Sequence, residues 1–78
     1  MEFVVYSKHN CPYCTKIKKI LELKNYTYQE LVYEQDFDKD QFYNQFGEGS
    51  TFPQVIFNNQ KLGGCVDSIK YLKDNNLL

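Results

Sequence analysis

The sequence contains no Trp, no Arg and no Ala, and neither sign of charge is in strong excess. Nine Lys stand against ten Asp plus Glu, which leaves a formal net charge of −1 at pH 7. That balance gives no electrostatic basis for a dedicated nucleic-acid binder or for a polybasic membrane anchor. No apolar run approaches the roughly 20 residues of a membrane span, so we expect no membrane partner.

The first residues also lack the basic region and the long apolar segment of a secretory signal peptide. We therefore expect a cytoplasmic protein. Missing Ala and Arg, together with plentiful Lys, Asn, Tyr, Phe and Ile, are typical of an AT-rich genome. If that genome is viral, the expected location is the host cytoplasm.

Cysteine is scarce and present in an odd number, three. A secreted disulfide scaffold of this size usually carries four, six or eight cysteines. Two of the three lie close together, in the run Cys11-Pro12-Tyr13-Cys14. In a cytosolic protein this spacing indicates redox chemistry or a metal site rather than structural cross-linking.

What the chain does have is enough apolar material for one small domain, which we expect to span residues 1–78. A chain of this size buries only about 60–65% of its unfolded surface, so its core is thin. Hydrophobic residues make up 42% and aromatic residues 17% of the sequence. Disordered chains are poor in aromatic residues, so this composition indicates a folded protein.

The N-terminal half predicts a strand, a helix and a second strand. Residues 3–6 are β-branched and aromatic and too few for a helix, which predicts a buried strand. Beyond the Cys pair, apolar residues recur at helical spacing on one face and lysines fill the other. This helix is expected to begin at Pro12 and to close at Asn25. Residues 26–33 predict the second strand.

The C-terminal half predicts a helix, a β-hairpin and a final helix. Asp38, followed three residues later by Gln41, has the spacing of a capping box, and Gly47 ends that helix. Two strand-like runs, residues 54–57 and 60–62, flank a two-residue turn, which is the pattern of a β-hairpin.

The final helix is expected after Gly63-Gly64, with Asp67 as its cap and Val66 with Tyr71 as a hydrophobic staple. The resulting order, β-α-β-α-β-β-α, predicts an α/β fold with a mixed sheet, because a β-α-β crossover joins parallel strands. Helices are expected on both faces. The expected core consists of Phe3, Val5, Ile17, Leu21, Phe42, Val55, Phe57, Ile69 and Leu72.

The Cys pair lies at the predicted start of the first helix, with Cys11 at the N-cap and Cys14 three residues on. Residues three apart share a helix face, so the two sulfurs can reach bonding distance. A thiolate at Cys11 can accept hydrogen bonds from the free N–H groups of Tyr13 and Cys14. The helix dipole adds about half a positive charge there. Both effects predict a depressed pKa for Cys11.

Ionisation of the Cys11 thiol mainly makes Cys11 a better leaving group in a mixed disulfide. Full ionisation of a thiol of pKa about 8.5 raises its thiolate about 30-fold at pH 7. Intrinsic nucleophilicity falls by about 25- to 55-fold over a drop of about 3.5 pKa units, so attack by Cys11 roughly breaks even. Departure of Cys11 becomes faster, because a thiolate of low pKa leaves readily. We therefore expect an enzyme that turns over mixed disulfides quickly.

A metal site is the alternative use of these residues. Zinc needs about four ligands, and Cys11, Cys14, Cys65 and His9 would supply that number. Neighbouring residues rarely fit a tetrahedron, so we expect no metal. Taken singly, His9 is expected as an exposed loop residue or as a modest electrostatic aid to Cys11. Cys65 is expected as a small packed residue or as a thiol that forms a side disulfide under oxidative stress.

Three motifs together resemble the glutaredoxins of the thioredoxin superfamily. The run Cys11-Pro12-Tyr13-Cys14 matches the dithiol glutaredoxin active site letter for letter. Thr51-Phe52-Pro53 resembles the family's Thr-Val-Pro, with Phe in place of Val. The segment from Gly63 to Asp67 matches its Gly-Gly-x-x-Asp. The resemblance covers the whole chain and implies a thioredoxin-like fold with a four-stranded mixed sheet flanked by helices.

The resemblance also implies a glutathione site. Pro53 would be a cis proline facing the Cys pair, and Phe52 would offer its main chain to the cysteine of glutathione as an added strand does. Asp67 would take the γ-glutamyl ammonium, and Lys8 the glycyl carboxylate. The full set of implied glutathione-binding residues is Lys8, Tyr13, Thr51, Phe52, Pro53, Gly64, Cys65, Val66 and Asp67.

The implied activity is a glutathione-dependent thiol–disulfide oxidoreductase in which Cys11 attacks and Cys14 resolves. Glutathione is then a reducing co-substrate, with no bound cofactor, and the partners are disulfide-containing or glutathionylated proteins, ribonucleotide reductase being a common client of the family. We expect a monomer. Three alternatives stay open: a redoxin served by thioredoxin reductase, an iron–sulfur cluster binder or carrier, which Pro12 disfavours, and a redox-regulated adaptor without turnover.

Overall fold

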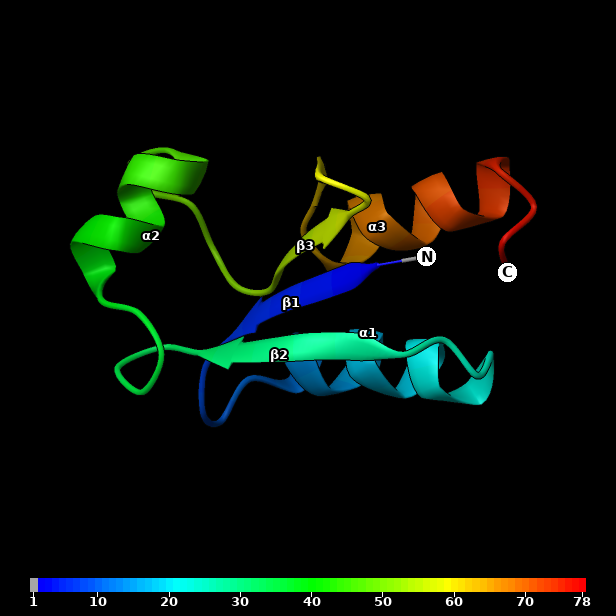
Figure 1. The fold of residues 1–78 in the computed structure, drawn as a ribbon, viewed down its shortest axis with the longest axis horizontal. Coiled ribbons are helices and arrows are strands. Elements are labelled where there is room, and N and C mark those ends of the chain that lie inside the picture. The colour runs from blue at the N-terminus through cyan, green and yellow to red at the C-terminus, as the bar shows by residue number, and fades with distance from the viewer. Residues whose placement is uncertain (1) are drawn as a thin grey trace.

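The computed structural model describes residues 2–78. Four strands and three helices follow one another in the predicted order (Figure 1). Their bounds are β1 Phe3–Ser7, α1 Pro12–Leu23, β2 Tyr28–Val32, α2 Lys39–Phe46, β3 Gln54–Phe57, β4 Gln60–Gly63 and α3 Cys65–Asp74. The predicted β-α-β-α-β-β-α order is therefore confirmed, with the second strand starting two residues later than expected.

The four strands form one mixed sheet in the order β2-β1-β3-β4. Strand β1 pairs in parallel with β2, so that Val5 lies beside Glu30, and antiparallel with β3 on its other side. Strands β3 and β4 form the predicted hairpin. Its turn residues Asn58 and Asn59 both have positive φ, 50° and 68°, as a two-residue turn of this kind requires.

One face of the sheet carries the aliphatic core. Phe3, Val5 and Ser7 alternate along β1 with their side chains on this face, and all three are buried. Helices α1 and α3 cover it through Ile17, Leu21 and Leu72, and they also pack against each other. The expected core is confirmed except at Ile69, which is only partly buried, and Phe42, which is buried outside this cluster. The cluster also includes Leu62 and Cys65.

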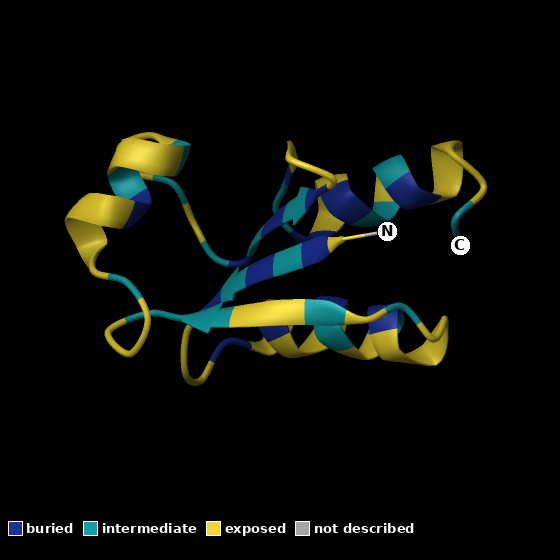
Figure 2. Cartoon of the chain, viewed as in Figure 1, coloured by how far each residue is buried: buried dark blue, intermediate teal, exposed yellow. Residues whose placement is uncertain are grey.

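The opposite face is aromatic and packs against α2. Tyr6 alternates with Val5 on β1 and contacts Phe37 and Phe46, with ring centroids 5.2 and 4.9 Å apart. Helix α2 lies beyond one end of the sheet (Figure 1) and buries a single residue, Phe42. The rest of its surface is exposed or half-buried (Figure 2).

Local sequence explains how α1 ends and how α2 begins and ends. Asn25, with φ of 61°, follows the last turn of α1, and the N–H groups of Asn25 and Tyr26 donate to Glu22 and Leu21. This left-handed closure keeps Tyr26 out of β2. At α2, Asp38 and Gln41 form both hydrogen bonds of the predicted capping box, and Gly47 ends the helix.

The start of α3 differs from the prediction. The N-cap is Gly64, without a side-chain hydrogen bond, and Asp67 is the third residue of the helix, so the expected cap was wrong. Gly63 has a positive φ of 99°, which turns the chain sharply enough for the helix to begin at Cys65. Val66 is consequently 72% exposed and forms no staple with Tyr71.

Across residues 2–78, the structure has no helix with the length and apolar character that a membrane span requires.

Candidate active site

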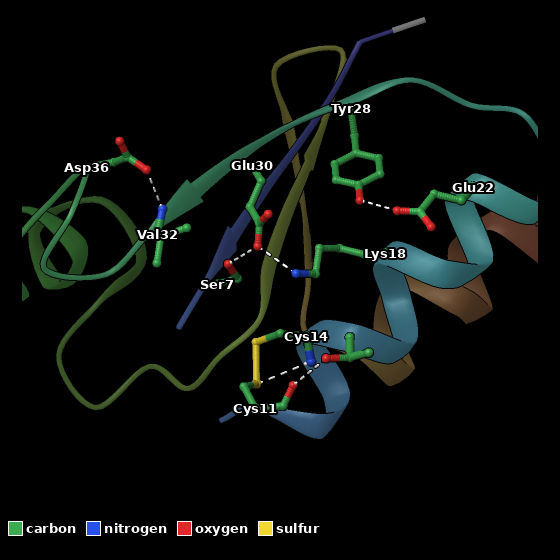
Figure 3. Close-up of polar contacts among 10 residues, drawn as sticks. Ser7, Cys11, Cys14, Lys18, Glu22, Tyr28, Glu30, Val32 and Asp36 are labelled. Atoms are coloured by element: carbon green, nitrogen blue, oxygen red, sulfur yellow. Dashed lines mark hydrogen bonds and ion pairs between the residues drawn. A yellow bond between two sulfur atoms is a disulfide. The ribbon is translucent and has the colours of Figure 1, made fainter. Parts of the chain in front are cut away.

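The two cysteines lie at the first turn of α1 and are joined by a disulfide, with their Cα atoms 5.2 Å apart (Figure 3). Cys11 is the N-cap, as predicted, and its Sγ accepts a hydrogen bond from the N–H of Cys14 at 3.2 Å. The expected second donor, the N–H of Tyr13, makes no such bond in the oxidised pair described. Cys11 is 9% exposed and Cys14 only 1%, so Cys11 is the more accessible sulfur.

A surface groove of about 220 Å³ lies beside the Cys motif. Its walls come from three separate stretches of chain: the Cys motif, the segment before β3 and the start of α3. The peptide bond between Phe52 and Pro53 is cis, as predicted, and Pro53 is buried. The groove is lined by Tyr13, Thr51, Phe52, Pro53, Gly64, Cys65, Val66 and Asp67, which are all the implied glutathione-binding residues except Lys8.

The start of α3 gives this groove its polar character. The first N–H groups of a helix, here those of Cys65 and Val66, have no partner within the helix, and Gly64 supplies no capping side chain in its place. Asp67 is exposed in the first turn, close enough to Gly63 that a Cβ there would lie 3.0 Å from its carboxylate. The groove therefore presents free N–H donors beside one carboxylate, a combination that suits a group carrying both an anion and an ammonium.

Lys8 lies outside the groove. Its Nζ is 5.5 Å from the centroid of the Phe52 ring, on the side of Phe52 that faces Tyr33 and α2. The lysine is exposed and has no ion-pair partner among the described residues. It can therefore approach a ligand in the groove from the rim at Phe52.

A second and larger depression, of about 740 Å³, lies against Cys11 and is called the hollow here. Three of its side chains are already bonded to one another: the Glu30 carboxylate accepts hydrogen bonds from Ser7 at 2.6 Å and Lys18 at 2.7 Å (Figure 3). The bond from the Lys18 ammonium, and then that from Ser7, hold the pKa of Glu30 below its ordinary value. The hollow is lined by Ser7, Lys8, His9, Asn10, Cys11, Pro12, Thr15, Lys18, Glu30 and Val32.

The sequence analysis missed this triad of Ser7, Lys18 and Glu30. Its members come from β1, α1 and β2, and their meeting depends on the parallel register that places Ser7 beside Val32. The one available signal was a charged residue in the middle of a strand, which is rarely left unpaired. His9 is exposed on the rim of the hollow, in agreement with the simpler of its two expected roles.

Cys65 is buried, 5% exposed, at the first position of α3. Burial raises the pKa of its thiol, and nearby Lys16 only partly opposes that shift. It is a free thiol within the aliphatic core. In the described part of the chain no three or more His, Cys, Asp and Glu side chains are grouped to hold a metal, so His9 and the cysteines do not form a ligand set.

Sequence comparison places this arrangement among known proteins. The sequence profile of the Glutaredoxin family matches residues 3–62, more than half of the chain. Glutaredoxin 1 of Rickettsia prowazekii is 34% identical over 76 residues, which cover 95% of this chain and 80% of that protein.

Solved structures agree. The structure of glutaredoxin 1 from Francisella tularensis superposes with a TM-score of 0.80 at 24% identity, covering 97% of this chain and 95% of that one, which shows the fold. A buckwheat glutaredoxin–glutathione complex superposes with a TM-score of 0.76 at 29% identity, covering 96% of this chain and 71% of that one.

The thioredoxin-like fold, the dithiol at the start of α1 and the family match together establish the class of reaction. Both cysteines of the motif are present, and they pair in the structure. The activity is that of a glutathione-dependent thiol–disulfide oxidoreductase, and the chain belongs to the glutaredoxin family.

Proposed function

We propose that glutathione binds in the groove with its cysteine against Phe52 and Pro53 and its sulfur directed at Cys11. One observation carries this proposal: residues from three stretches far apart in the sequence line a single groove at the Cys motif. A glutaredoxin similar to this chain was solved as a complex with glutathione. An extended tripeptide can pair with the main chain of Phe52 as an added strand.

The ends of glutathione are assigned by charge. The γ-glutamyl carboxylate suits the free N–H groups of Cys65 and Val66, and its ammonium suits the Asp67 carboxylate. The glycyl carboxylate is then at the opposite end of the groove, within reach of Lys8 across the Phe52 ring. Because Phe52 acts through its main chain, a larger side chain at this position does not by itself prevent binding.

The reaction follows from which sulfur is accessible. The Cys11 thiolate attacks one sulfur of a client disulfide, and the other client sulfur leaves as a thiolate and is protonated. Cys14 then attacks the Cys11 sulfur, which releases the reduced client and forms the Cys11–Cys14 disulfide seen in the structure. One glutathione thiolate reopens this bond at Cys11, and a second removes the first as glutathione disulfide. Two thiols of glutathione are oxidised for each client disulfide reduced.

We further propose that the protein acts as a monomer in the cytoplasm, on disulfide-containing or glutathionylated proteins that include ribonucleotide reductase. A single reactive Cys pair, with no multi-disulfide framework, fits a reducing compartment. Glutathione is the reductant in this proposal, and no bound cofactor takes part.

A coupled assay tests the function directly. The protein is supplied with glutathione, glutathione reductase, NADPH and a small mixed disulfide of glutathione, and NADPH consumption is followed. We expect turnover that depends on both glutathione and Cys11. Turnover with thioredoxin reductase and none with glutathione would show that thioredoxin reductase, and not glutathione, reduces the protein. Absorption in the near-visible range by the purified protein would instead indicate an iron–sulfur cluster.

A further inference from the structure

A separate small pocket, of about 210 Å³, lies on the far side of the Phe52 side chain from the groove. Its floor is the Phe52 ring, stacked on Phe42 with centroids 4.2 Å apart and an interplanar angle of 11°. The pocket touches the groove through Phe52 and the hollow through Lys8. We call it the aromatic pocket, and it is lined by Lys8, Tyr33, Lys39, Phe42, Tyr43 and Phe52.

Two ammonium groups face these rings. Lys8 Nζ is 5.5 Å from the centroid of Phe52, and Lys39 Nζ is 5.7 Å from that of Tyr43. Within residues 2–78 the ion pairs are Lys18–Glu30 and Lys70–Asp74, so neither lysine of the pocket has a carboxylate partner within 4.0 Å. The pocket thus holds two positive charges without an internal anion.

The acidic segment that precedes α2 does not supply that anion. The Asp36 carboxylate accepts the N–H of Val32 at 2.7 Å, and the Asp38 carboxylate accepts the N–H of Gln41 at 2.8 Å. Both side chains are therefore turned toward their own backbone. A carboxylate from outside the chain is the group that the aromatic pocket lacks.

A protein client differs from glutathione at this end of the groove. Under the proposed function, on which this inference rests, glutathione ends in a glycyl carboxylate near Lys8. A polypeptide continues past its cysteine and has no terminal carboxylate there. One or two extended residues span about 3 to 7 Å, and Phe52, which lines both the groove and the aromatic pocket, makes the two sites adjacent.

We propose that Lys8 and Lys39 select protein clients in which a Glu or Asp follows the reactive cysteine by one or two residues. The acidic side chain enters the aromatic pocket and supplies the missing carboxylate between the two ammonium groups. A carboxylate leaves both cation–π contacts in place, because it approaches the lysines from the open side. An aromatic client side chain would have to displace an ammonium from the ring that it covers.

An exchange equilibrium measures this preference. A Cys14→Ser protein carrying glutathione on Cys11 is mixed with a peptide thiol of the form acetyl-Gly-Cys-Gly-Glu-amide or acetyl-Gly-Cys-Gly-Gln-amide, whose blocked ends leave the Glu side chain as the one carboxylate. The peptide thiolate attacks the Cys11 sulfur, the Cys11–glutathione bond breaks, and glutathione leaves as a thiol, so no net oxidation occurs. The same exchange with free glutathione disulfide corrects for the intrinsic strength of each peptide thiol.

We expect the corrected constant to favour the Glu peptide over the Gln peptide by about three- to fivefold at low salt, and by less at 0.5 M salt. Lys39→Gln should remove most of this ratio, and Lys39→Glu should bring it below one. Lys39 is exposed at the first position of α2, where an acidic residue suits the helix dipole, so these variants should fold. Lys73→Gln, an exposed lysine on α3, is the matched control and should leave the ratio unchanged.

The outcomes distinguish the aromatic-pocket inference from the proposed function. Normal loading of glutathione on Cys11 with equal constants for the two peptides would overturn the aromatic-pocket inference alone. It would be overturned equally if Lys39→Glu left the ratio of the Glu and Gln exchange constants unchanged. The same holds if a peptide with Phe in place of Glu had the larger exchange constant. Failure of Cys11 to accept glutathione at all would overturn the proposed function together with the inference.

Discussion

Two depressions meet at the Cys motif, and they differ in what their polar groups already do. In the hollow, the Ser7 hydroxyl, the Lys18 ammonium and the Glu30 carboxylate are bonded to one another. In the groove, α3 begins at a glycine, and its first N–H groups have no side-chain acceptor. The hollow is the larger, at about 740 Å³ against about 220 Å³, yet the one carboxylate in its lining, Glu30, is already satisfied by the chain itself.

Under the proposed function, the difference teaches that unsatisfied donors identify the binding surface better than volume does. Backbone N–H groups at a helix start are strong donors that must find an acceptor. At α1 the acceptor is the Cys11 sulfur, 3.2 Å from the N–H of Cys14. At α3 no side chain fills that place, and under the proposed function the γ-glutamyl carboxylate of glutathione does. Changes in the groove should therefore alter glutathione kinetics, and changes to the bonded triad Ser7, Lys18 and Glu30 in the hollow should alter stability only.

The largest effect is expected at the boundary between the two depressions. Cys11→Ser should abolish removal of glutathione from a small mixed disulfide, because it removes the attacking sulfur. Cys14→Ser should keep substantial activity in that assay, since Cys11 alone can take glutathione and pass it to a second glutathione. With a protein disulfide, Cys14→Ser should lose most activity, because the bulky mixed disulfide needs an internal thiol for release.

Steady-state rates of both variants with both substrates test this division of labour. Equal loss from both variants with both substrates would contradict it. Activity retained in Cys11→Ser would show that the nucleophile is misassigned, and Cys65 would be the first thiol to examine in its place.

The second prediction contrasts Cys11 with Cys65 at the groove wall. In the reduced protein, iodoacetamide should modify Cys11 at least about a hundredfold faster than Cys65. Burial raises the pKa of Cys65, and a thiol that is 5% exposed reacts only through local opening. An opening free energy of about 3 kcal/mol alone slows modification about a hundredfold. Peptide mass mapping after timed alkylation gives the two rates, and comparable rates would mean that α3 opens freely at its start.

The third prediction concerns the charge at the groove. Asp67→Ala should weaken glutathione use by about 1–2 kcal/mol, or about five- to thirtyfold in kcat/KM, because it removes the partner of the γ-glutamyl ammonium. Asp67 is not the N-cap of α3, so the accompanying loss of stability should be limited to about 0.3–1 kcal/mol. Asp74→Ala, at the other end of the same helix, is the control and should leave glutathione kinetics unchanged.

Kinetics that stay at the wild-type level in Asp67→Ala, with only a lower melting temperature, would confine Asp67 to a structural role. In that case the polar groups at the start of α3 would not explain why glutathione binds in the groove rather than in the hollow.

The groove could be anticipated from the sequence because each of its walls carries a motif. These motifs are the Cys pair, Thr51-Phe52-Pro53 and the Gly-Gly segment. Each is a run of contiguous residues, so it can be recognised in the sequence without knowing which other segment the fold places beside it. The start of α3 was misplaced because two glycines in a row allow several turns, and the positive φ of Gly63 decides which one forms.

The hollow and the aromatic pocket could not be predicted in the same way. Each depends on side chains brought together by strand register or by the packing of α2, such as Phe52 on Phe42 and Ser7 on Glu30. Periodicity assigns a residue to a face of its own element and says nothing about its partner on another element. Lys8 was assigned to the glutathione site from the family resemblance alone, and only the structure reveals that Lys8 lies at the Phe52 ring, outside the groove lining.

The smallest effect is expected in the hollow, from Glu30→Gln. The pKa of Glu30 is held below its ordinary value of 4.5, so the carboxylate stabilises the fold above about that pH and loses this contribution as the pH falls through its folded pKa. The Glu30 side chain is 33% exposed, and its ion pair with Lys18 is partly screened, so we expect a contribution below about 1 kcal/mol. Free energies of unfolding from urea denaturation at pH 7 and pH 3 measure it.

Glu30→Gln should narrow the difference in stability between these two pH values, because the amide cannot ionise yet can still accept the Ser7 hydroxyl. Glu48→Gln, in the exposed loop after α2, is the control and should leave the difference as in the wild type. Glutathione kinetics should stay within about twofold of wild type in both variants, since the Glu30 carboxylate is already bonded to Ser7 and Lys18 and offers a ligand little to bind. A marked rise in the KM for glutathione in Glu30→Gln alone would place part of the ligand in the hollow and break the contrast between the two depressions.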